Sequence, residues 1–211
     1  SMPQMVSIFN GLGGLSAVLL SFIELYKVSF LGGEASLAYQ ILLILSLFIG
    51  SVAFTGSMLA FAKLNGYKWS EKLSLPYQHI INIVLLVAIL YFSYQYFEVN
   101  NDFNLIYFVL GVSFLYGIFF VAPIGGADMP VVISLLNSFT GLTAALTGII
   151  FDNKVMLLGG ILVGAAGTIL TILMCKAMNR SLLNVIIGGF SSSGKKTSKG
   201  VQGGDIKEIN D

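Results

Sequence analysis

Charged residues are scarce in this sequence, and their scarcity argues against a soluble domain. Of the 211 residues, 10% are charged and 56% are hydrophobic, whereas about a quarter of the residues in a typical soluble domain are charged. The mean hydropathy is +0.88. The net charge is +1 and the lysines fall in loops and a tail, so no nucleic-acid partner is expected. This composition predicts an integral membrane protein.

Cysteine and histidine are nearly absent, with one residue of each, Cys175 and His79. A single cysteine excludes an intramolecular disulfide and a cysteine cluster for zinc or an iron–sulfur centre. With one histidine, we expect no metal site built from protein groups. The sequence shows no pattern for a Ser–His–Asp triad, a catalytic carboxylate pair or a phosphate-binding loop. The glycine run at 11–14 lacks the spacing of a dinucleotide-binding fingerprint. The sequence therefore predicts no catalytic or cofactor-binding residue on this chain, and no basic segment that would mark a cleaved signal peptide.

Six apolar runs are each long enough to cross a bilayer, which takes about 20 residues of helix. Every backbone N–H and C=O must be bonded within such a span, so runs of this length predict helices. We therefore expect an all-α integral membrane protein with six transmembrane helices. Their expected ranges are 5–26, 37–62, 79–97, 104–123, 129–151 and 155–176.

Basic residues predict the orientation of these helices. With six crossings, nine of the eleven Lys and Arg residues fall on the side of the two termini, and two fall on the other side. Cytoplasmic loops carry the excess of basic residues, so both termini are expected in the cytoplasm, or in the matrix of a mitochondrion. The nine are Lys63, Lys68, Lys72, Lys176, Arg180, Lys195, Lys196, Lys199 and Lys207.

An internal repeat relates residues 124–146 (IGGADMPVVISLLNSFTGLTAAL) to residues 2–20 at an offset of 127. Both copies start from the same side in the predicted topology, which makes this a parallel repeat. Gly56-Ser57 and Gly167-Thr168 hold similar positions before the next basic residues, so the repeat is expected to include the second helix of each pair. The coinciding positions are Met2/Met129, Pro3/Pro130, Ser7/Ser134, Asn10/Asn137, Gly14/Gly141, Leu15/Leu142 and Ala17/Ala144.

Four of the predicted helices carry small and polar residues at alternating spacings of three and four, which place them on one helix face. Such a stripe lets helix backbones approach closely, and its Ser and Asn side chains can bond across the interface. We expect the stripes of the first two helices to pack together. The stripes are Ser7, Asn10, Gly14, Ala17 and Ser21; Ser46, Gly50, Ala53, Ser57 and Ala60; Ser134, Asn137, Gly141, Ala145 and Gly148; and Gly160, Gly164, Gly167 and Thr171.

Intramembrane polarity supplies the candidate functional residues, Asn10, Ser57 and Asn137. Polar groups in a span face a bundle interior or a water-filled path, so these three are candidates for a hydrated relay. Interhelical hydrogen bonding is the structural alternative, and the sequence leaves both open. No Asp, Glu, Lys, Arg or His lies near the centre of any span, and Asn and Ser do not change protonation at physiological pH. If protons pass, the titrating group must therefore come from a mouth residue or from another subunit.

Several polar residues lie at the ends of the predicted spans. Asp128 precedes Met129-Pro130 as an N-cap, and a carboxylate at a membrane mouth is also where ions enter. His79 is expected to anchor its helix at the interface, with Asn82 one turn on, and a functional role is the alternative. Arg180 is either a positive-inside anchor or a docking residue for a soluble domain. We expect residues 1–190 to form the transmembrane domain and residues 191–211, rich in Ser, Gly and Lys, to form a hydrophilic linker.

Four stretches strongly resemble one family, the beta subunit of proton-translocating nicotinamide nucleotide transhydrogenase. They are MPQMVSIFNGLGG, FTGSMLAFAKL, IGGADMPVVISLLNSFTG and GAAGTILTILMCKAMNRSLLNVIIGGF, and the resemblance covers residues 2–190. It implies a membrane domain that couples proton flow to hydride transfer from NADH to NADP+. NAD(H) and NADP(H) would be bound by separate soluble domains of the full complex and not by this chain.

The resemblance also implies roles, partners and a location. Asn10, Ser57 and Asn137 match polar residues that line the family's proton channel, and Asp128 and Arg180 match its junction with the NADP(H)-binding domain. Implied partners are membrane lipid, alpha-type transhydrogenase helices and the two nucleotide-binding domains, in a homodimer of the full complex within a bacterial inner membrane rather than a mitochondrial one. The helix-six glycines, matched to a stripe linked to domain coupling, are Gly160, Gly164 and Gly167.

Two departures from the family pattern qualify this expectation. Some members carry a histidine, a proposed proton carrier, where this chain has Asn10, so here a histidine on a neighbouring subunit is expected to serve instead. The family's beta subunit also has further helices before Met2 and an NADP(H)-binding domain after the linker, so this chain alone is not expected to transfer hydride. The alternative function is a free-standing six-helix carrier or channel for a small uncharged or polar solute.

Overall fold

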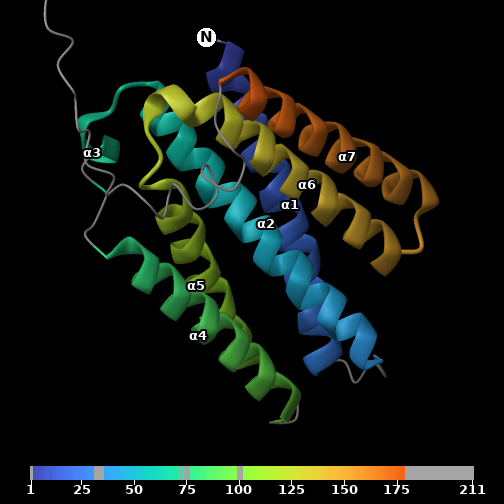
Figure 1. The fold of residues 1–211 in the computed structure, drawn as a ribbon. Coiled ribbons are helices and arrows are strands. Elements are labelled where there is room, and N and C mark those ends of the chain that lie inside the picture. Colours follow the sequence, from blue (N-terminus) through green and yellow to red (C-terminus); the bar gives the residue numbers. More distant parts are fainter. Residues whose placement is uncertain (1, 31–35, 72, 74–76, 99–101, 179–211) are drawn as a thin grey trace, which may run out of the picture.

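The computed structural model describes residues 2–30, 36–71, 73, 77–98 and 102–178. Within these ranges the chain is helical and forms no strand, and six helices are long and apolar enough to cross a membrane, which confirms the predicted fold class (Figure 1). The elements are α1 (Met2–Phe30), α2 (Leu37–Leu64), α3 (Lys68–Glu71), α4 (Gln78–Glu98), α5 (Phe103–Val121), the 3-10 turn η1 (Gly126–Asp128), α6 (Met129–Ile150) and α7 (Lys154–Ala177).

The observed helices extend past the predicted apolar runs mainly where polar residues continue the helix. α1 begins at Met2 and ends at Phe30, whereas the apolar run predicted 5–26. Backbone hydrogen bonding does not stop where the hydrocarbon stops, so helices continue into their polar flanks. α5 ends at Val121, two residues earlier than expected, because the chain turns there toward η1. The short helix α3 was not predicted, since its four residues show no apolar periodicity.

The helices form a bundle in which α1 and α2 lie between two outer pairs, α4 with α5 and α6 with α7 (Figure 1). Two apolar clusters hold the bundle together. One joins α2, α5 and α6 around Leu136 and Val121, and the other joins α1, α2, α4 and α5 around Leu43 and Tyr96. The most exposed helices are α4 and α7, because only 17% of the residues in the most apolar stretch of each are buried within this chain. They therefore present the most surface to the membrane.

One end of the bundle, called here the Asp128 end, gathers the starts of α1 and α6. The Nε2 atom of Gln4 donates to the carbonyl oxygen of Leu64 at 3.2 Å, and Lys63 Nζ donates to that of Ile124 at 2.8 Å. The opposite end, called the Glu24 end, gathers the end of α1 and the start of α5, where the rings of Phe30 and Phe103 are 5.6 Å apart. Because α1 and α6 start at the same end, the repeat is parallel.

The repeat is preserved in the way the helices pack. A methyl group on Gly14 would lie 2.9 Å from the carbonyl oxygen of Gly50, so α1 and α2 touch through their backbones. The equivalent Gly141 would meet the backbone of Gly164 on α7 in the same way. These contacts confirm that the stripes of α1 and α2 pack together, and they show that α6 and α7 form a second pair of the same kind.

The second helices of the two pairs correspond as well. Gly50 on α2 faces Val18, and Gly160 on α7 faces Ala145, the residue that the repeat aligns with Val18. This correspondence matches Ser57 with Gly167. The sequence had matched Ser57 with Thr168, which is wrong by one residue because the basic residues used as the reference are not equivalent: Lys63 follows Ser57 by six residues, and Lys176 follows Gly167 by nine.

Candidate functional site

The two polar side chains predicted on α1 and α2 are in direct contact. Asn10 Nδ2 donates to Ser57 Oγ at 2.8 Å, and Ser7 Oγ donates to the carbonyl oxygen of Ser57 at 2.6 Å. Asn10 is 6% exposed, and the two serines are fully buried. The Oδ1 atom of Asn10 is buried and has no hydrogen-bond partner among the described residues. A buried amide oxygen of this kind is a position where a water molecule or a partner's donor can bind.

A third helix reaches this site through Thr140 on α6. The Oγ1 atom of Thr140 lies 3.4 Å from the carbonyl oxygen of Asn10 and 3.1 Å from that of Leu136, within hydrogen-bonding distance of both. A methyl group on Gly13 would lie 2.8 Å from the Thr140 side chain, so α1 approaches α6 closely here. Sequence reasoning missed Thr140. The sequence did contain a signal for it: Thr140 is a polar residue one turn after Asn137, and it lies outside the small-residue stripe of its helix.

Asn137 is half-buried on α6 and does not contact Asn10 or Ser57. Its surroundings repeat those of Asn10 with one difference. Ser134 Oγ donates to the carbonyl oxygen of Gly167 at 3.1 Å, as Ser7 does to Ser57. However, Gly167 has no hydroxyl, and Asn137 Nδ2 lies 3.3 Å from the point where a side chain would begin. In the part of the chain that the structure describes, the Asn137 amide makes no side-chain hydrogen bond. Asn10 is hydrogen-bonded to Ser57, whereas the Asn137 amide is free to bond to a group from outside this chain.

The mouth residue Asp128 ends η1 and precedes α6. Pro130 lies in the first turn of α6, as predicted. Asp128 is the N-cap residue of α6, as predicted, but its side chain makes no cap hydrogen bond and its backbone is already helical, with φ −92° and ψ −2°. One carboxylate oxygen, Oδ1, is shielded from solvent.

Lys63 fixes the loop that leads to Asp128. Its Nζ atom donates to the carbonyl oxygens of Val121, the last residue of α5, and of Ala122 and Ile124 in the loop that follows. A cation at a helix C-terminus also interacts favourably with the helix dipole. The sequence identified Lys63 only as a contributor to orientation, whereas the structure makes it the link between α2 and the α5–α6 loop.

The remaining predicted residues lie elsewhere. Asn82 is buried at 3% exposure, and its Nδ2 atom lies 3.5 Å from the carbonyl oxygen of Phe119, to which Gln78 Nε2 donates at 3.1 Å. Asn82 therefore joins α4 to α5 and not to the Asn10–Ser57 site. The backbone of His79 lies in α4, but its side chain is outside the described part of the chain, as are Arg180 and residues 191–211.

Three glycines of α7 were predicted to matter together, and the structure separates them. Side chains on Gly160 and Gly167 would collide with α6, at the Ala145 backbone and at Ser138 Oγ respectively. A methyl group on Gly164 would lie 3.6 Å from its nearest neighbours, which is an ordinary contact. At this point the residue with no room for a side chain is Gly141, which faces Gly164. The α6–α7 contact therefore depends on Gly160, Gly167 and Gly141.

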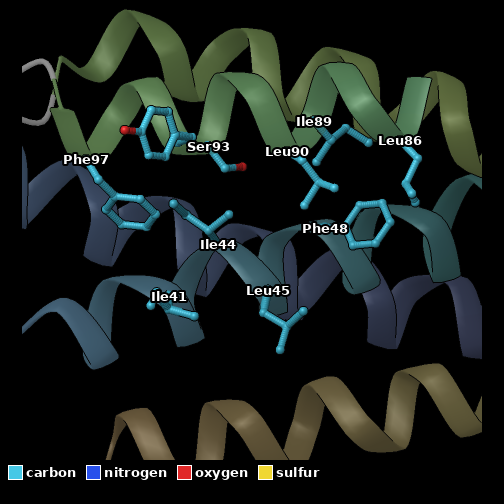
Figure 2. A pocket seen from close by; sticks show the side chains of 10 residues that line it. Ile41, Ile44, Leu45, Phe48, Leu86, Ile89, Leu90, Ser93 and Phe97 are labelled. Atoms are coloured by element: carbon cyan, nitrogen blue, oxygen red, sulfur yellow. The ribbon is translucent and has the colours of Figure 1, made fainter. Parts of the chain in front are cut away.

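A groove of about 350 Å³ lies between α2 and α4, away from these polar residues (Figure 2). Its lining is apolar apart from Ser93 and the Tyr94 ring, with Ile44, Phe48 and Leu90 among the contributing side chains. Such a lining suits hydrocarbon and offers little to a polar solute. In the residues that the structure covers, no three His, Cys, Asp or Glu side chains lie close enough together to hold a metal ion.

Comparison with known proteins identifies one family across the chain. A family profile described as "NAD(P) transhydrogenase beta subunit" matches residues 1–211. Two curated relatives named "NAD(P) transhydrogenase subunit beta", from Rhodospirillum rubrum and from a named strain of that species, are each 38% identical over 210 residues. The match covers 97% of this chain and 45% of each relative, so the chain spans less than half the length of these relatives.

Proposed function

The chain belongs to the NAD(P) transhydrogenase beta subunit family, and from this membership we propose that it conducts protons across the membrane in a proton-translocating transhydrogenase. Proton flow through the helix bundle is coupled to hydride transfer from NADH to NADP+ in soluble domains of the complex. Those domains bind NAD(H) and NADP(H). This chain supplies the membrane path and its connection to them.

The observation that carries this proposal is the Asn10–Ser57 pair, in which Asn10 Oδ1 has no hydrogen-bond partner among the described residues. An amide and a hydroxyl can order water into a hydrogen-bonded line, and a buried polar site with spare hydrogen-bonding capacity is where such water binds. Neither group titrates at physiological pH. The proton carrier therefore has to be a mouth carboxylate or a histidine from an alpha-type membrane helix that docks against this bundle.

Asn137 provides the second polar group of the path. Its amide faces Gly167, at the α6–α7 contact, and has no side-chain partner in the described residues. A water molecule or a residue of a docking helix fills that position in the assembled complex. This places the two asparagines in different roles, with Asn10 held by Ser57 and Asn137 held by a group from outside this chain.

Asp128, Arg180 and the α7 glycines connect the path to the NADP(H)-binding domain. Backbone contacts without interlocking side chains, as at Gly160 and Gly141, let one helix shift along another with little repacking. Residues 191–211 tether that domain. A change in nucleotide state thereby reaches α6 through α7 and alters access at the Asp128 mouth.

The complete complex is a homodimer in a bacterial inner membrane, surrounded by lipid, with both termini of this chain on the cytoplasmic side. The basic residues support this orientation. A free-standing carrier is not favoured by the family membership, and the groove between α2 and α4 gives a polar solute no site.

Replacing Asn137 tests the proposal in the complete complex reconstituted into vesicles. We expect Asn137→Leu to slow both proton pumping and NADPH formation at least about tenfold, because a branched apolar side chain cannot order water or bond to a docking helix. The matched control is Asn104→Leu, which makes the same change at an exposed residue at the start of α5. Undiminished pumping by an assembled Asn137→Leu complex would remove Asn137 from the path.

A further inference from the structure

The polar contact between α1 and α2 continues beyond Asn10 toward the Glu24 end. Ser21 on α1 and Ser46 on α2 are 1% and 0% exposed, and neither hydroxyl has a hydrogen-bond partner among the described residues. Most buried hydroxyls in folded proteins are bonded, so two unpartnered ones on facing stripes call for an explanation. The two stripes from Ser7 to Ser21 and from Ser46 to Ser57 are called here the α1–α2 seam.

Glu24 extends the α1 stripe of the seam by one step, and Tyr39 extends the α2 stripe by two. Glu24 follows Ser21 by three residues, and Tyr39 precedes Ser46 by seven, so each lies on the same helix face as the serine. Their side chains meet, with Tyr39 Oη donating to Glu24 Oε2 at 3.3 Å. The seam therefore ends on a carboxylate.

The surroundings of Glu24 place this carboxylate between the seam and the membrane surface. Its side chain is 13% exposed, and its Oε1 atom accepts a hydrogen bond from Lys27 Nζ at 2.6 Å, while the Lys27 side chain is 51% exposed. Within the described residues, the titratable groups that face Glu24 are Lys27 on its own helix and Tyr39 on α2. One side of the carboxylate thus meets water and the other meets Tyr39 and the seam.

The distance along α1 from Gln4 to Glu24 matches the thickness of a membrane. Twenty residues separate Gln4 from Glu24, and at about 1.5 Å per residue they span about 30 Å, the thickness of the hydrocarbon layer. Gln4 lies at the Asp128 end, where it donates to Leu64. Glu24 therefore lies about one hydrocarbon thickness from Gln4, toward the other end of the bundle.

The second copy of the repeat lacks this arrangement. The positions equivalent to Ser21 and Glu24 are Gly148 and Phe151. The α6–α7 pair packs closely with Phe151 at the position of Glu24, and its nearest carboxylate, Asp152, is exposed in the turn between the helices, so helix packing of this kind does not require Glu24. Its presence is particular to the copy that contains the Asn10–Ser57 pair.

The seam is closed between its two polar parts. Gly14 and Gly50 touch through their backbones, and a methyl group on either would lie within 3.0 Å of the other's carbonyl oxygen. Asn10 and Ser57 lie on one side of this contact, and Ser21 and Ser46 lie on the other. Between the two glycines there is no room for even a methyl group.

We propose that Glu24 is the carboxylate that exchanges protons with water at the end of the α1–α2 seam opposite Asp128, and that the Gly14–Gly50 contact separates it from Asn10. This inference rests on the proposed proton-conducting function and names a titrating group for it within this chain. Glu24 takes a proton from hydronium at the surface, forming one carboxyl O–H bond and leaving water. It then releases that proton to water held by Ser21 and Ser46 when the glycine contact opens, and it works in reverse for flow in the other direction.

The test uses the complete complex reconstituted into vesicles that enclose a pH-sensitive dye, with NADH and NADP+ as substrates. We expect Glu24→Gln to slow pumping and NADPH formation together at least about tenfold. Glu24→Asp, which keeps the carboxyl group, restores at least part of both rates. The control is Glu98→Gln. Glu98 is an exposed carboxylate at the Glu24 end, and like Glu24 it accepts a hydrogen bond from a tyrosine, here from Tyr94 Oη at 3.0 Å. Its rates should match those of the unaltered complex.

The outcomes separate the two proposals. If the unaltered complex pumps and an assembled Glu24→Gln complex pumps equally well, Glu24 is not the exchanging group, although the proton-conducting function stands. If the unaltered complex forms NADPH without moving protons, the proposed function itself fails. If Glu24→Gln does not assemble, the Glu24→Asp complex decides: a pH–rate profile identical to that of the unaltered complex across the acidic limb would overturn the role of Glu24, whereas a displaced limb supports it.

Discussion

Two asparagines that look equivalent in the sequence have different partners in the structure. The repeat aligns Asn10 with Asn137, and both follow a serine that donates to a carbonyl of the neighbouring helix. One has the Ser57 hydroxyl beside it, and the other has Gly167. This difference could not be predicted from the stripes, because it depends on which residues of two helices face each other across loops of unequal length.

Lys63 provides a prediction at the scale of one side chain. Replacing it with Met keeps the aliphatic stem but leaves the carbonyls of Val121, Ala122 and Ile124 without this donor. We expect Lys63→Met to lower the free energy of unfolding by about 1 to 3 kcal/mol and to speed backbone hydrogen exchange in the α5–α6 loop. Thermal unfolding and hydrogen exchange measured by mass spectrometry check both effects.

The control for this prediction is Lys68→Met, since Lys68 is exposed in α3. Exposed substitutions of this kind usually change stability by less than about 0.5 kcal/mol. If Lys63→Met exchanges hydrogen in the loop no faster than Lys68→Met does, Lys63 does not hold the loop that leads to Asp128.

At the scale of helices, much of the architecture was predictable from the sequence. Apolar length identified the six membrane-crossing helices, and the spacing of small residues identified the face that α1 presents to α2. Both are local properties, set by the bilayer and by 3.6 residues per turn. The backbone conformation of Asp128, the short helix α3 and the contact of Thr140 with Asn10 were missed, because each depends on residues brought together by the fold.

The α6–α7 pair provides a prediction about glycine at a helix contact. A methyl group on Gly141 would collide with the backbone of Gly164, so the helices must move apart. We expect Gly141→Ala to destabilise the protein by about 1 to 3 kcal/mol. Gly111→Ala is the control, because nothing lies within 4 Å of its added methyl group, and alanine is the better helix former by about 1 kcal/mol.

Thermal unfolding of the two variants in the same detergent checks this prediction. A melting temperature for Gly141→Ala equal to or above that of Gly111→Ala would show that the two helices are not held in backbone contact. The same result would weaken the proposal that α7 transmits the state of the NADP(H)-binding domain by moving along α6.

At the scale of the whole molecule, two helix pairs of common design carry different chemistry. The α1–α2 pair contains the amide–hydroxyl site and ends on a carboxylate, and the α6–α7 pair contains an amide with no side-chain partner in the described residues. Thr140 connects the two pairs beside Asn10. The chain spans 45% of the length of its relatives, and the nucleotide-binding domains proposed to drive proton flow belong to the rest of the complex.

The central claim, that protons cross beside the Asn10–Ser57 pair, is tested most directly by one paired measurement. Proton movement and NADPH formation are recorded together in vesicles containing the complete complex, with Asn10 unaltered or replaced by Leu. We predict that Asn10→Leu lowers both rates at least about tenfold while assembly and nucleotide binding are retained. An assembled Asn10→Leu complex that pumps protons at the unaltered rate would contradict the account.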